Sequence, residues 1–439
     1  MKQKLLGKVS LLLVCVLLVL SLASCAGLKK PYPSKNELQF WVEVLSTDGY
    51  TTVAEHLEAW HFPTFSAAKL AACEDLFKKV YYRELPDAHT LAQRVADIYL
   101  EKFYDETDKT SEVENTTALI NSYIAAVGDK YAVYRSETEY KDYSSDMSGN
   151  YVGIGVSVRH DAVEDIIRIT EVVPDGPADA AGVLPNDIIY SVDGVTAKSL
   201  GYSATVAAVR GEAGSTFVLG VLREGTLVEF TITRRAMTDQ TVRYSLDEQG
   251  GIAYVRITQF KGNTAQQFRE AIDKLEENSL TKGYIFDVRG NPGGYLYSVV
   301  EIISYLTPKD SMVVCFTPSY SDPMYDTDDH QLDKPMVILT SEYTASAGEL
   351  FASSVREIKD CQIIGKTTYG KGVMQNTYLF TDKASLTLTI CEYNPPSGKN
   401  YDGIGVIPDY VVENTEDTDN QLLVANEKLL EKIQKETNK

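Results

Sequence analysis

Residues 336–358 read MVILTSEYTASAGELFASSVREI, and this stretch decides the fold of the second half of the chain. Its first five residues form an apolar run that predicts a buried strand, and the apolar spacing after Ser346 predicts a helix over 347–358. A serine that opens a helix in a turn of small residues points its hydroxyl outward. The N–H of Ala347 then lies at the positive end of the helix dipole, where it would stabilise an oxyanion. The alternative is that Ser346 only caps the helix, which is what most serines at this position do.

A general base for Ser346 has to come from a residue other than histidine. The last histidine, His330, precedes the serine, which excludes the nucleophile elbow of an α/β-hydrolase. A lysine can take this role, and Lys371 lies between two glycines in IGKTTYGKGVMQ (364–375). We expect Lys371 to begin a strand in which Gln375 shares its face and orients the amine. Since a lysine is a base only when neutral, its pKa must lie well below about 10.4, and the glycines let backbone close over it.

Two glycine-rich turns allow further interpretations. Residues 365–371 fit G-x-x-x-x-G-K, the start of a phosphate-binding loop, but Gly372 stands where Ser or Thr should hold magnesium. The alternating residues after it predict strands instead of a helix, so nucleotide binding is disfavoured. The turn DVRGNPGG (287–294) follows a predicted strand, and Gly293 and Gly294 can aim a backbone N–H at an oxyanion. The alternative is a tight turn with no chemical role.

The sequence pattern changes in residues 149–235, where short strand-like runs alternate with glycine turns. A one-turn helix is predicted at 177–181 and a second helix at 203–209. This order resembles a PDZ domain, with YVGIGV (151–156) in the position of the carboxylate-binding loop. Such a loop captures a peptide carboxylate with backbone N–H groups while the peptide adds as a strand. The residues expected to bind the peptide are Gly153, Ile154, Gly155 and Val156. The alternative is a small β-domain used as a spacer.

The N-terminus has the features of an export signal. Three lysines precede the apolar run Val9–Leu20, which is too short for a comfortable membrane span of about 20 residues. The following residues, LASC (22–25), resemble the lipobox of bacterial lipoproteins. We therefore expect residues 1–25 to be a lipoprotein signal peptide and Cys25 to carry a lipid that tethers the protein outside the bacterial cell membrane. An ordinary signal peptide or anchor helix with an incidental cysteine is the alternative.

The overall composition narrows the classes of partner. Among the 439 residues, 42 Lys and Arg face 62 Asp and Glu, which gives a net charge of −20. An acidic surface repels phosphate backbones, so nucleic acid is a poor partner. The six cysteines are scattered without a CxxC pair, which disfavours a zinc knuckle and a disulfide scaffold alike. We expect neither a metal nor a cofactor.

Four motifs together resemble the carboxyl-terminal processing proteases, also called tail-specific proteases: DVRGNPGG, SEYTASAGEL, GKTTYGKGVMQ and YNPPSGKNYDGIGVIPDY. They occur in family order, and the resemblance covers nearly the whole exported chain. It implies a multidomain α+β protein with a protease core of the ClpP/crotonase-like type. The expected segments are a linker (26–36), a helical N-terminal region (37–147), a PDZ domain (148–236), the serine protease core (237–412) and a C-terminal helical tail (413–439).

The same resemblance implies a serine endopeptidase that cuts proteins near their carboxyl termini. Ser346 would be the nucleophile, Lys371 the general base and Gln375 its orienting partner. Ala347 and the Gly293–Gly294 turn would form the oxyanion hole, and we see no departure from the family at the catalytic positions. The expected partners are proteins or peptides with accessible carboxyl termini, and a homodimer through the N-terminal helices is suggested. The alternative for the whole chain is a catalytically idle PDZ adaptor.

One arginine is a candidate for regulation. Arg210, in VRGEAG (209–214), follows the second predicted PDZ helix, and this segment also resembles the family. Its guanidinium could report occupancy of the peptide site to the core by pairing with a carboxylate or a backbone carbonyl. The alternative is a surface arginine that caps the carboxyl end of the helix.

Overall fold

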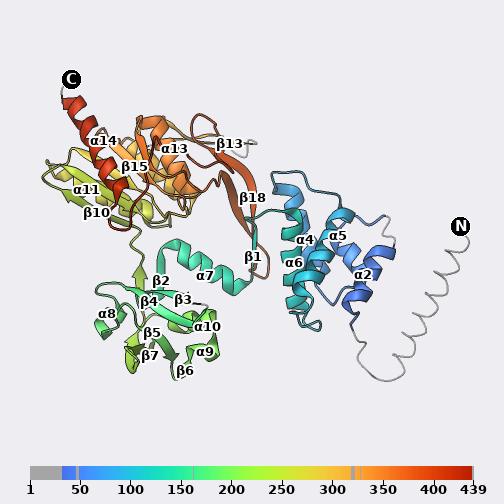
Figure 1. Ribbon diagram of the computed structural model, residues 1–439. Helices are drawn as coiled ribbons and strands as arrows, with labels where there is room; N and C mark the ends of the chain where they lie inside the picture. Colours follow the sequence, from blue (N-terminus) through green and yellow to red (C-terminus); the bar gives the residue numbers. More distant parts are fainter. Residues whose placement is uncertain (1–31, 46–48, 162, 318–321, 327, 438–439) are drawn as a thin grey trace, which may run out of the picture. The chain divides into compact units, whose positions relative to one another are not determined.

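The computed structural model describes residues 32–45, 49–161, 163–317, 322–326 and 328–437 (Figure 1). The chain divides into two compact units. The first unit contains the chain up to Glu137 together with Gln375–Ile390, and the second contains Thr138–Met374 together with Cys391–Lys439. The predicted export signal, with Cys25, lies outside the described residues. Within the described ranges, no helix combines the length and the apolar character that a membrane crossing needs.

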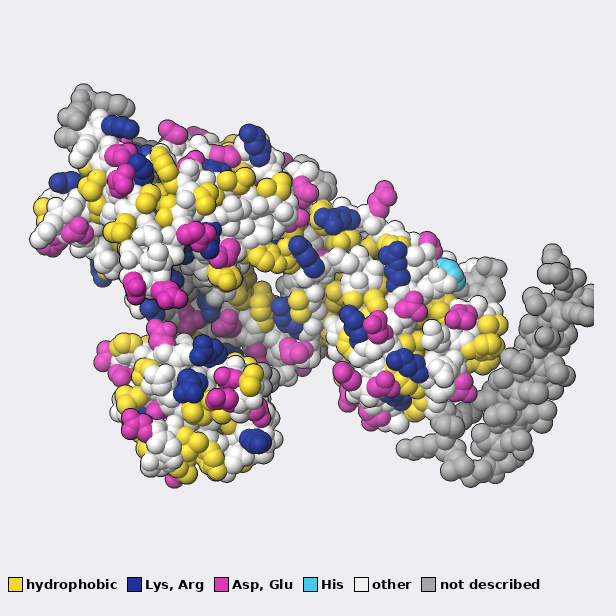
Figure 2. All heavy atoms as spheres, in the orientation of Figure 1, with side chains coloured by type: hydrophobic (Ala, Val, Ile, Leu, Met, Phe, Trp, Pro, Cys, Tyr) yellow, Lys and Arg dark blue, Asp and Glu magenta, His cyan; other side chains and the backbone are white. Residues whose placement is uncertain are grey.

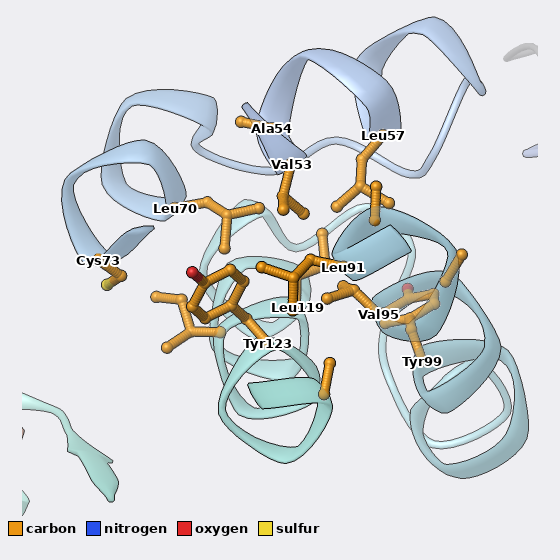
Figure 3. Packing of buried hydrophobic residues seen from close by; sticks show 14 of the residues in the cluster. Val53, Ala54, Leu57, Leu70, Cys73, Leu91, Val95, Tyr99, Leu119 and Tyr123 are labelled. Carbon is orange, nitrogen blue, oxygen red and sulfur yellow. The ribbon is translucent and has the colours of Figure 1, made fainter. Parts of the chain in front are cut away.

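The first unit is built from helices that bury large apolar side chains between them (Figure 3). The side chains of Trp60, Phe77, Leu119 and Tyr123 are almost completely inaccessible to solvent. Polar residues begin several helices, as for α6, where the Ser111 hydroxyl accepts a hydrogen bond from a backbone N–H of the first turn. The helical elements are α2 (Lys35–Val44), α3 (Val53–Ala59), α4 (Ala67–Val80), α5 (Ala88–Ile98), the π-turn η1 (Tyr99–Phe103) and α6 (Glu112–Val127).

A strand segment from late in the sequence belongs to this helical unit. The strands β17 (Val373–Leu379) and β18 (Ser385–Asn394) pair with each other, and β1 (Val133–Arg135) pairs antiparallel with β18. Leu386 and Leu388 of β18 are fully buried in the helical core. Residues 375–390 therefore pack as part of the first unit, although the sequence range predicted for the protease core, 237–412, contains them.

The second unit starts with α7 (Glu137–Ser148), most of which it contains, and continues into a small β-domain. One sheet has the strand order β3–β4–β5–β7–β8, with β6 on β5, and a separate ladder joins β2 to β9. Gly182 ends the one-turn helix α8 in the left-handed conformation that its predicted position requires. The elements are β2 (Asn150–Gly153), β3 (Val156–Asp161), β4 (Ile166–Val172), α8 (Pro177–Ala181), β5 (Ile188–Val192), β6 (Val195–Thr196), α9 (Ala197–Leu200), α10 (Tyr202–Val209), β7 (Thr216–Arg223), β8 (Thr226–Thr233) and β9 (Arg235–Thr238).

A six-stranded sheet forms the centre of the rest of the second unit, in the order β10–β11–β12–β15–β16–β19. All neighbouring strands are parallel except β10, which is antiparallel to β11. The elements are β10 (Val242–Asp247), β11 (Ile252–Ile257), α11 (Thr264–Glu277), β12 (Gly283–Asp287), α12 (Leu296–Leu306), β13 (Met312–Thr317), β14 (Met324–Tyr325), β15 (Met336–Thr340), α13 (Ala347–Lys359), β16 (Gln362–Gly365), β19 (Tyr410–Val411) and α14 (Asn420–Thr437).

Both faces of this sheet are covered at its centre, which explains why β12 and β15 are buried along their whole length. On β12, Ile285 belongs to the same apolar cluster as Leu429 of α14. The next residue, Phe286, points to the opposite face and contacts the rings of Phe268 and Phe351, from α11 and α13. The C-terminal tail is thus a helix packed on the core, because Leu429 is completely buried.

The parallel strands β12, β15 and β16 are neighbours, and each is followed by one of the motifs singled out above. DVRGNPGG continues from β12, SEYTASAGEL follows β15, and GKTTYGKGVMQ follows β16. The carboxyl ends of adjacent parallel strands meet at one edge of a sheet, where α/β proteins place their sites. The topology therefore gathers the three motifs at a single edge.

The exposed surface is mixed in charge. On the face that Figure 2 shows, Lys and Arg side chains are interspersed with Asp and Glu and do not gather in one basic patch. Cys73, Cys315, Cys361 and Cys391 are free thiols. In the described part of the chain, no group of three or more His, Cys, Asp or Glu side chains could hold a metal ion.

Candidate active site

Ser346 occupies a strained turn between β15 and α13. Its backbone has φ 56° and ψ −121°, a combination that is rare for a residue other than glycine. Such a conformation costs about 1–3 kcal/mol and persists only where surrounding contacts impose it. The side chain is half-buried, and the following residue, Ala347, is the first of the helix. The strained backbone is what turns the hydroxyl out of the strand-to-helix corner.

The backbone N–H of Ala347 is available as an oxyanion donor. It opens α13, and among the described residues it donates to no other group. Gly293 lies directly against it, since a Cβ on Gly293 would stand 2.7 Å from the Ser346 Cβ and 3.0 Å from the Ala347 nitrogen. The N–H of Gly293 itself donates to the side chain of Asn291, at 2.8 Å. Gly293 therefore provides the close approach, and Ala347 provides the unpaired donor.

The turn after β12 and the turn after β15 are tied together by buried polar contacts. The carbonyl of Asn291 accepts the N–H of Ala345 at 2.8 Å, and the Thr344 hydroxyl donates to the carbonyl of Val288 at 2.8 Å. Asn291 and Thr344 are both completely buried. A Cβ on Gly294 would meet the carbonyl oxygen of Phe260 at 2.1 Å, so this position also requires glycine.

A buried ion pair anchors the first of these turns to the C-terminal helix. Asp287, at the end of β12, accepts from Arg289 at 2.7 Å, and Arg289 also donates to Asp419 at 2.7 Å. Burial alone would lower the pKa of Arg289, but the hydrogen bonds to the two carboxylates raise it above its ordinary value. The guanidinium is therefore a permanent cation that fixes the turn.

Glu349 is a buried carboxylate that holds both candidate catalytic segments. One of its oxygens, Oε2, accepts the backbone N–H of Ser346 and the backbone N–H of Lys371, each at 2.8 Å. The other oxygen, Oε1, accepts the N–H of Gly370 at 2.7 Å and the hydroxyl of Thr368. Because one atom binds both backbones, the predicted nucleophile and the predicted base lie next to each other. The hydrogen bond between Glu349 and Lys371 joins residues that are 22 apart in sequence.

Lys371 does not begin a strand, because β17 starts two residues later, at Val373. Lys371 lies in the loop after β16, half-buried. The flanking glycines have the role that the sequence predicted. A Cβ on Gly370 would stand 3.0 Å from the nitrogen of Gly405, and one on Gly372 would stand 2.7 Å from the nitrogen of Asp402. The segment from the YNPPSGKNYDGIGVIPDY motif can thus pack closely over the lysine.

Gln375 belongs to the first unit, where its amide donates to the Thr389 hydroxyl at 3.2 Å. Thr389 in turn donates its hydroxyl and its backbone N–H to the carboxylate of Asp129, both at 2.9 Å. This chain of contacts holds the Gln375 side chain. Its role in orienting Lys371 stays a prediction.

Tyr393 opens the YNPPSGKNYDGIGVIPDY motif, and the sequence predicted no role for it, yet it touches the nucleophile. Its hydroxyl donates to the Oγ of Ser346 at 3.0 Å and lies 3.4 Å from the carbonyl oxygen of Lys371. The ring is buried and meets that of Tyr401 edge to face. Burial raises the pKa of Tyr401 well above its ordinary value, so this neighbouring hydroxyl keeps its proton.

The predicted peptide-binding loop lines a cavity of about 580 Å³, whose wall also includes residues outside the β-domain, among them Asp239, Arg243 and Lys261. Gly153, Ile154, Gly155 and Val156 all lie along it. Gly155 has φ 77°, and a Cβ there would stand 3.2 Å from the Cβ of Val173. Among the described residues, the N–H groups of Ile154 and Gly155 donate to no acceptor. They are therefore available to a carboxylate, as in the binding mode that a PDZ fold uses.

Arg210 also lines this cavity, but it is not the residue that caps α10 with its side chain. That role belongs to Arg234, whose guanidinium donates to the carbonyls of Val209 at 3.0 Å and Ala208 at 2.6 Å. Arg234 is almost completely buried and stands over the ring of Phe217. Among the described residues, the end of α10 is thus held by the side chain of Arg234 and not by that of Arg210.

Parts of the chain are similar in sequence to known protein families and to individual proteins. Residues 251–412 match the model of Peptidase family S41, and residues 151–233 match that of the PDZ domain. The chain is 28% identical over 306 residues to the carboxyl-terminal-processing protease of Synechocystis sp., which covers 68% of this chain and 71% of that protein. It is 30% identical over 314 residues to the carboxy-terminal processing protease CtpA of Bacillus subtilis, which covers 71% of this chain and 66% of that protein.

The photosystem II D1 C-terminal processing protease has 21% identity to this chain, with 78% of this chain and 92% of that chain covered and a TM-score of 0.47.

A peptidase core joined to a PDZ domain defines a serine-type peptidase. The chain belongs to the family of carboxyl-terminal processing proteases. The predictions of the family, of a multidomain α+β fold and of a serine-type peptidase are confirmed.

Proposed function

We propose that the protein is an exported, membrane-tethered endopeptidase that cleaves proteins near their carboxyl termini with a Ser346–Lys371 dyad. The observation that carries the dyad is the shared oxygen of Glu349, which accepts the backbone N–H groups of both residues. Ser346 has a strained backbone, and the adjacent N–H of Ala347 donates to no group among the described residues, so it can stabilise an oxyanion. Lys371 is a half-buried amine on a loop that glycines allow to be covered.

In this mechanism the neutral amine of Lys371 removes the hydroxyl proton of Ser346 as Oγ bonds to the scissile carbonyl carbon. The carbonyl electron pair moves to its oxygen, which accepts the N–H of Ala347. Collapse of this intermediate breaks the C–N bond, and the lysine ammonium gives its proton to the departing amine. Water then attacks the acyl-enzyme with Lys371 again as the base. Gln375 would orient the amine.

The cavity beside the PDZ loop would supply the preference for chain ends. The N–H groups of Ile154 and Gly155, which donate to no acceptor in the described part of the chain, suit a terminal carboxylate. The neighbouring wall includes the apolar side chains of Val206 and Val209. A bound tail would anchor a substrate so that its carboxyl-terminal region is presented to the core. The tail would also gate cleavage if it stabilised the active arrangement more than the resting one.

The proteolytic activity is tested by digestion of casein with the wild-type chain and with Ser346→Ala. We expect the wild type to cut and the variant not to. If both leave the substrate intact under varied conditions, the chain acts as a PDZ adaptor and the proposed function is wrong.

Arg210→Ala is expected to lower proteolysis several-fold while leaving the affinity for a carboxyl-terminal peptide nearly unchanged. The physical reason is that Arg234, and not Arg210, holds the end of α10, so the groove keeps its shape. Peptide affinity is measured by fluorescence anisotropy in a Ser346→Ala background, which prevents cleavage.

Gly155→Trp is the matched control for this prediction, because it fills the carboxylate loop and should weaken peptide binding itself. Cleavage of a protein substrate by Arg210→Ala at the wild-type rate would show that Arg210 does not relay occupancy of the groove.

Cys25→Ala is expected to release the protein from the membrane or to block its maturation, since it removes the only proposed lipid attachment. Membrane fractionation of cells that express either form measures this. A variant that still sediments with membranes like the wild type would contradict the lipid anchor. A homodimer through the N-terminal helices stays a prediction.

A further inference from the structure

Tyr393 connects the two halves of the proposed dyad. It lies on β18, and its backbone N–H donates to the carbonyl of Gly372 at 3.2 Å, next to Lys371. Its hydroxyl reaches the Oγ of Ser346 at 3.0 Å. The side chain of Tyr393 thus contacts the nucleophilic atom, and the backbone of Tyr393 is hydrogen-bonded to the segment that carries the base.

The direction of this hydrogen bond matters for the chemistry. A serine hydroxyl has one proton and two lone pairs, and a tyrosine hydroxyl has one proton to donate. Tyr393 donates to Ser346 at 3.0 Å, and a second acceptor, the carbonyl of Lys371, is farther away at 3.4 Å. With a lone pair of Oγ occupied by Tyr393, the serine proton stays available for the base.

The tyrosine ring is held before any substrate arrives. Tyr393 is 3% exposed, and β18 pairs with β13 at the register Phe316↔Tyr393. Its ring centroid lies 6.2 Å from that of Tyr401, with the planes at 88°. A donor that is fixed in advance needs no reorganisation when charge develops, which is the condition for strong electrostatic stabilisation.

We propose that the hydroxyl of Tyr393 is a further catalytic group, which orients the Ser346 hydroxyl and stabilises the charge that develops on its oxygen. This inference rests on the proposed Ser–Lys mechanism. While Lys371 takes the serine proton and the new C–O bond forms, Tyr393 keeps its own proton. Its hydrogen bond shortens and strengthens as Oγ becomes negative. It acts again in deacylation, when Oγ leaves the acyl carbon with its electron pair and recovers a proton from the lysine ammonium.

The test is Tyr393→Phe, which removes one oxygen and keeps the buried ring. We expect kcat for a peptide substrate to fall roughly 10- to 100-fold with KM nearly unchanged, because the lost donor acts on developing charge and not on substrate binding. The rate of labelling by a fluorophosphonate, which reports the nucleophilicity of Ser346 alone, should fall by a similar factor. The thermal unfolding midpoint and the affinity for a tail peptide should stay close to the wild type.

The matched control is Tyr284→Phe in the same core, since Tyr284 is also fully buried but its hydroxyl donates to Glu276. It should keep the wild-type kcat and labelling rate. If Tyr393→Phe hydrolyses and labels like the wild type, the inference is wrong while the dyad stands. If its activity falls only in step with a lower unfolding midpoint, the hydroxyl is structural and the inference is also wrong. A wild-type chain that neither cuts nor labels would instead overturn the proposed function.

Discussion

Replacing Lys371 with alanine is expected to abolish hydrolysis, with a fall in kcat of roughly 10⁴-fold or more. The physical reason is that the proposed mechanism has one proton acceptor for the serine, and no histidine follows His330 in the sequence. Alanine keeps the backbone N–H that donates to Glu349, so the substitution removes the amine and leaves the loop anchored. The measurement is peptide hydrolysis together with the thermal unfolding midpoint, which should change little because the side chain is only half-buried.

A matched control is Lys366→Ala, in the same loop. Lys366 makes exposed ion pairs with Glu342 and Glu413, which contribute little to stability, so its loss should leave kcat at the wild-type level.

Hydrolysis by the wild type should rise with pH as Lys371 loses its proton, and metal chelators should not affect it. Loss of activity in EDTA that zinc restores would contradict the Ser–Lys mechanism, and so would substantial turnover by Lys371→Ala.

The positions of Ser346 and Lys371 could be predicted because local patterns mark them. A strand, a turn of small residues and a helix start define Ser346, and two glycines define the loop of Lys371. The alternation of strands and helices predicts a parallel sheet, whose geometry brings the ends of β12, β15 and β16 together. Local patterns and sheet topology therefore carry most of the candidate site.

The remaining contacts depend on tertiary packing. Tyr393 meets Ser346 across 47 residues of chain, and the motif that Tyr393 opens does not by itself show this contact. The contact between Glu349 and Ser346 could be predicted from the sequence, because the two residues have the spacing of a capping box. What the pattern cannot show is that the same carboxylate also accepts N–H groups from Gly370 and Lys371.

The assignment of residues 375–390 to the helical unit could not be predicted for a similar reason. The alternation of apolar and polar residues marks one apolar face of a strand, whether it packs on helices or joins a larger sheet. In the structure β18 is buried along almost its whole length. The period of Leu386 and Leu388 is the same in both cases. Only the packing partner, here the helical core of the first unit, distinguishes a strand that packs on helices from one that joins a larger sheet.

Glu349→Gln is expected to lower both stability and activity, because the buried carboxylate accepts four hydrogen bonds. An amide retains one acceptor oxygen and presents an NH₂ group to the remaining donors. Two unsatisfied donors cost on the order of 2–5 kcal/mol of unfolding free energy. The strained backbone of Ser346 then loses a contact that imposes it, and misplacement of the nucleophile should lower kcat by on the order of 10²-fold. Thermal unfolding and peptide hydrolysis, measured well below the unfolding midpoint, check the two effects separately.

Glu357→Gln provides the comparison on the same helix, α13. Its carboxylate is exposed and accepts two bonds from Ser397, at 2.8 Å and 2.7 Å, and water can replace them. We expect it to keep its activity and most of its stability. Because Glu349 acts on Ser346 through the backbone, its loss should slow fluorophosphonate labelling even where the chain is fully folded. If Glu349→Gln is destabilised but labels at the wild-type rate at low temperature, the carboxylate stabilises the fold without positioning the nucleophile. The shared contact with Lys371 would then no longer support the dyad.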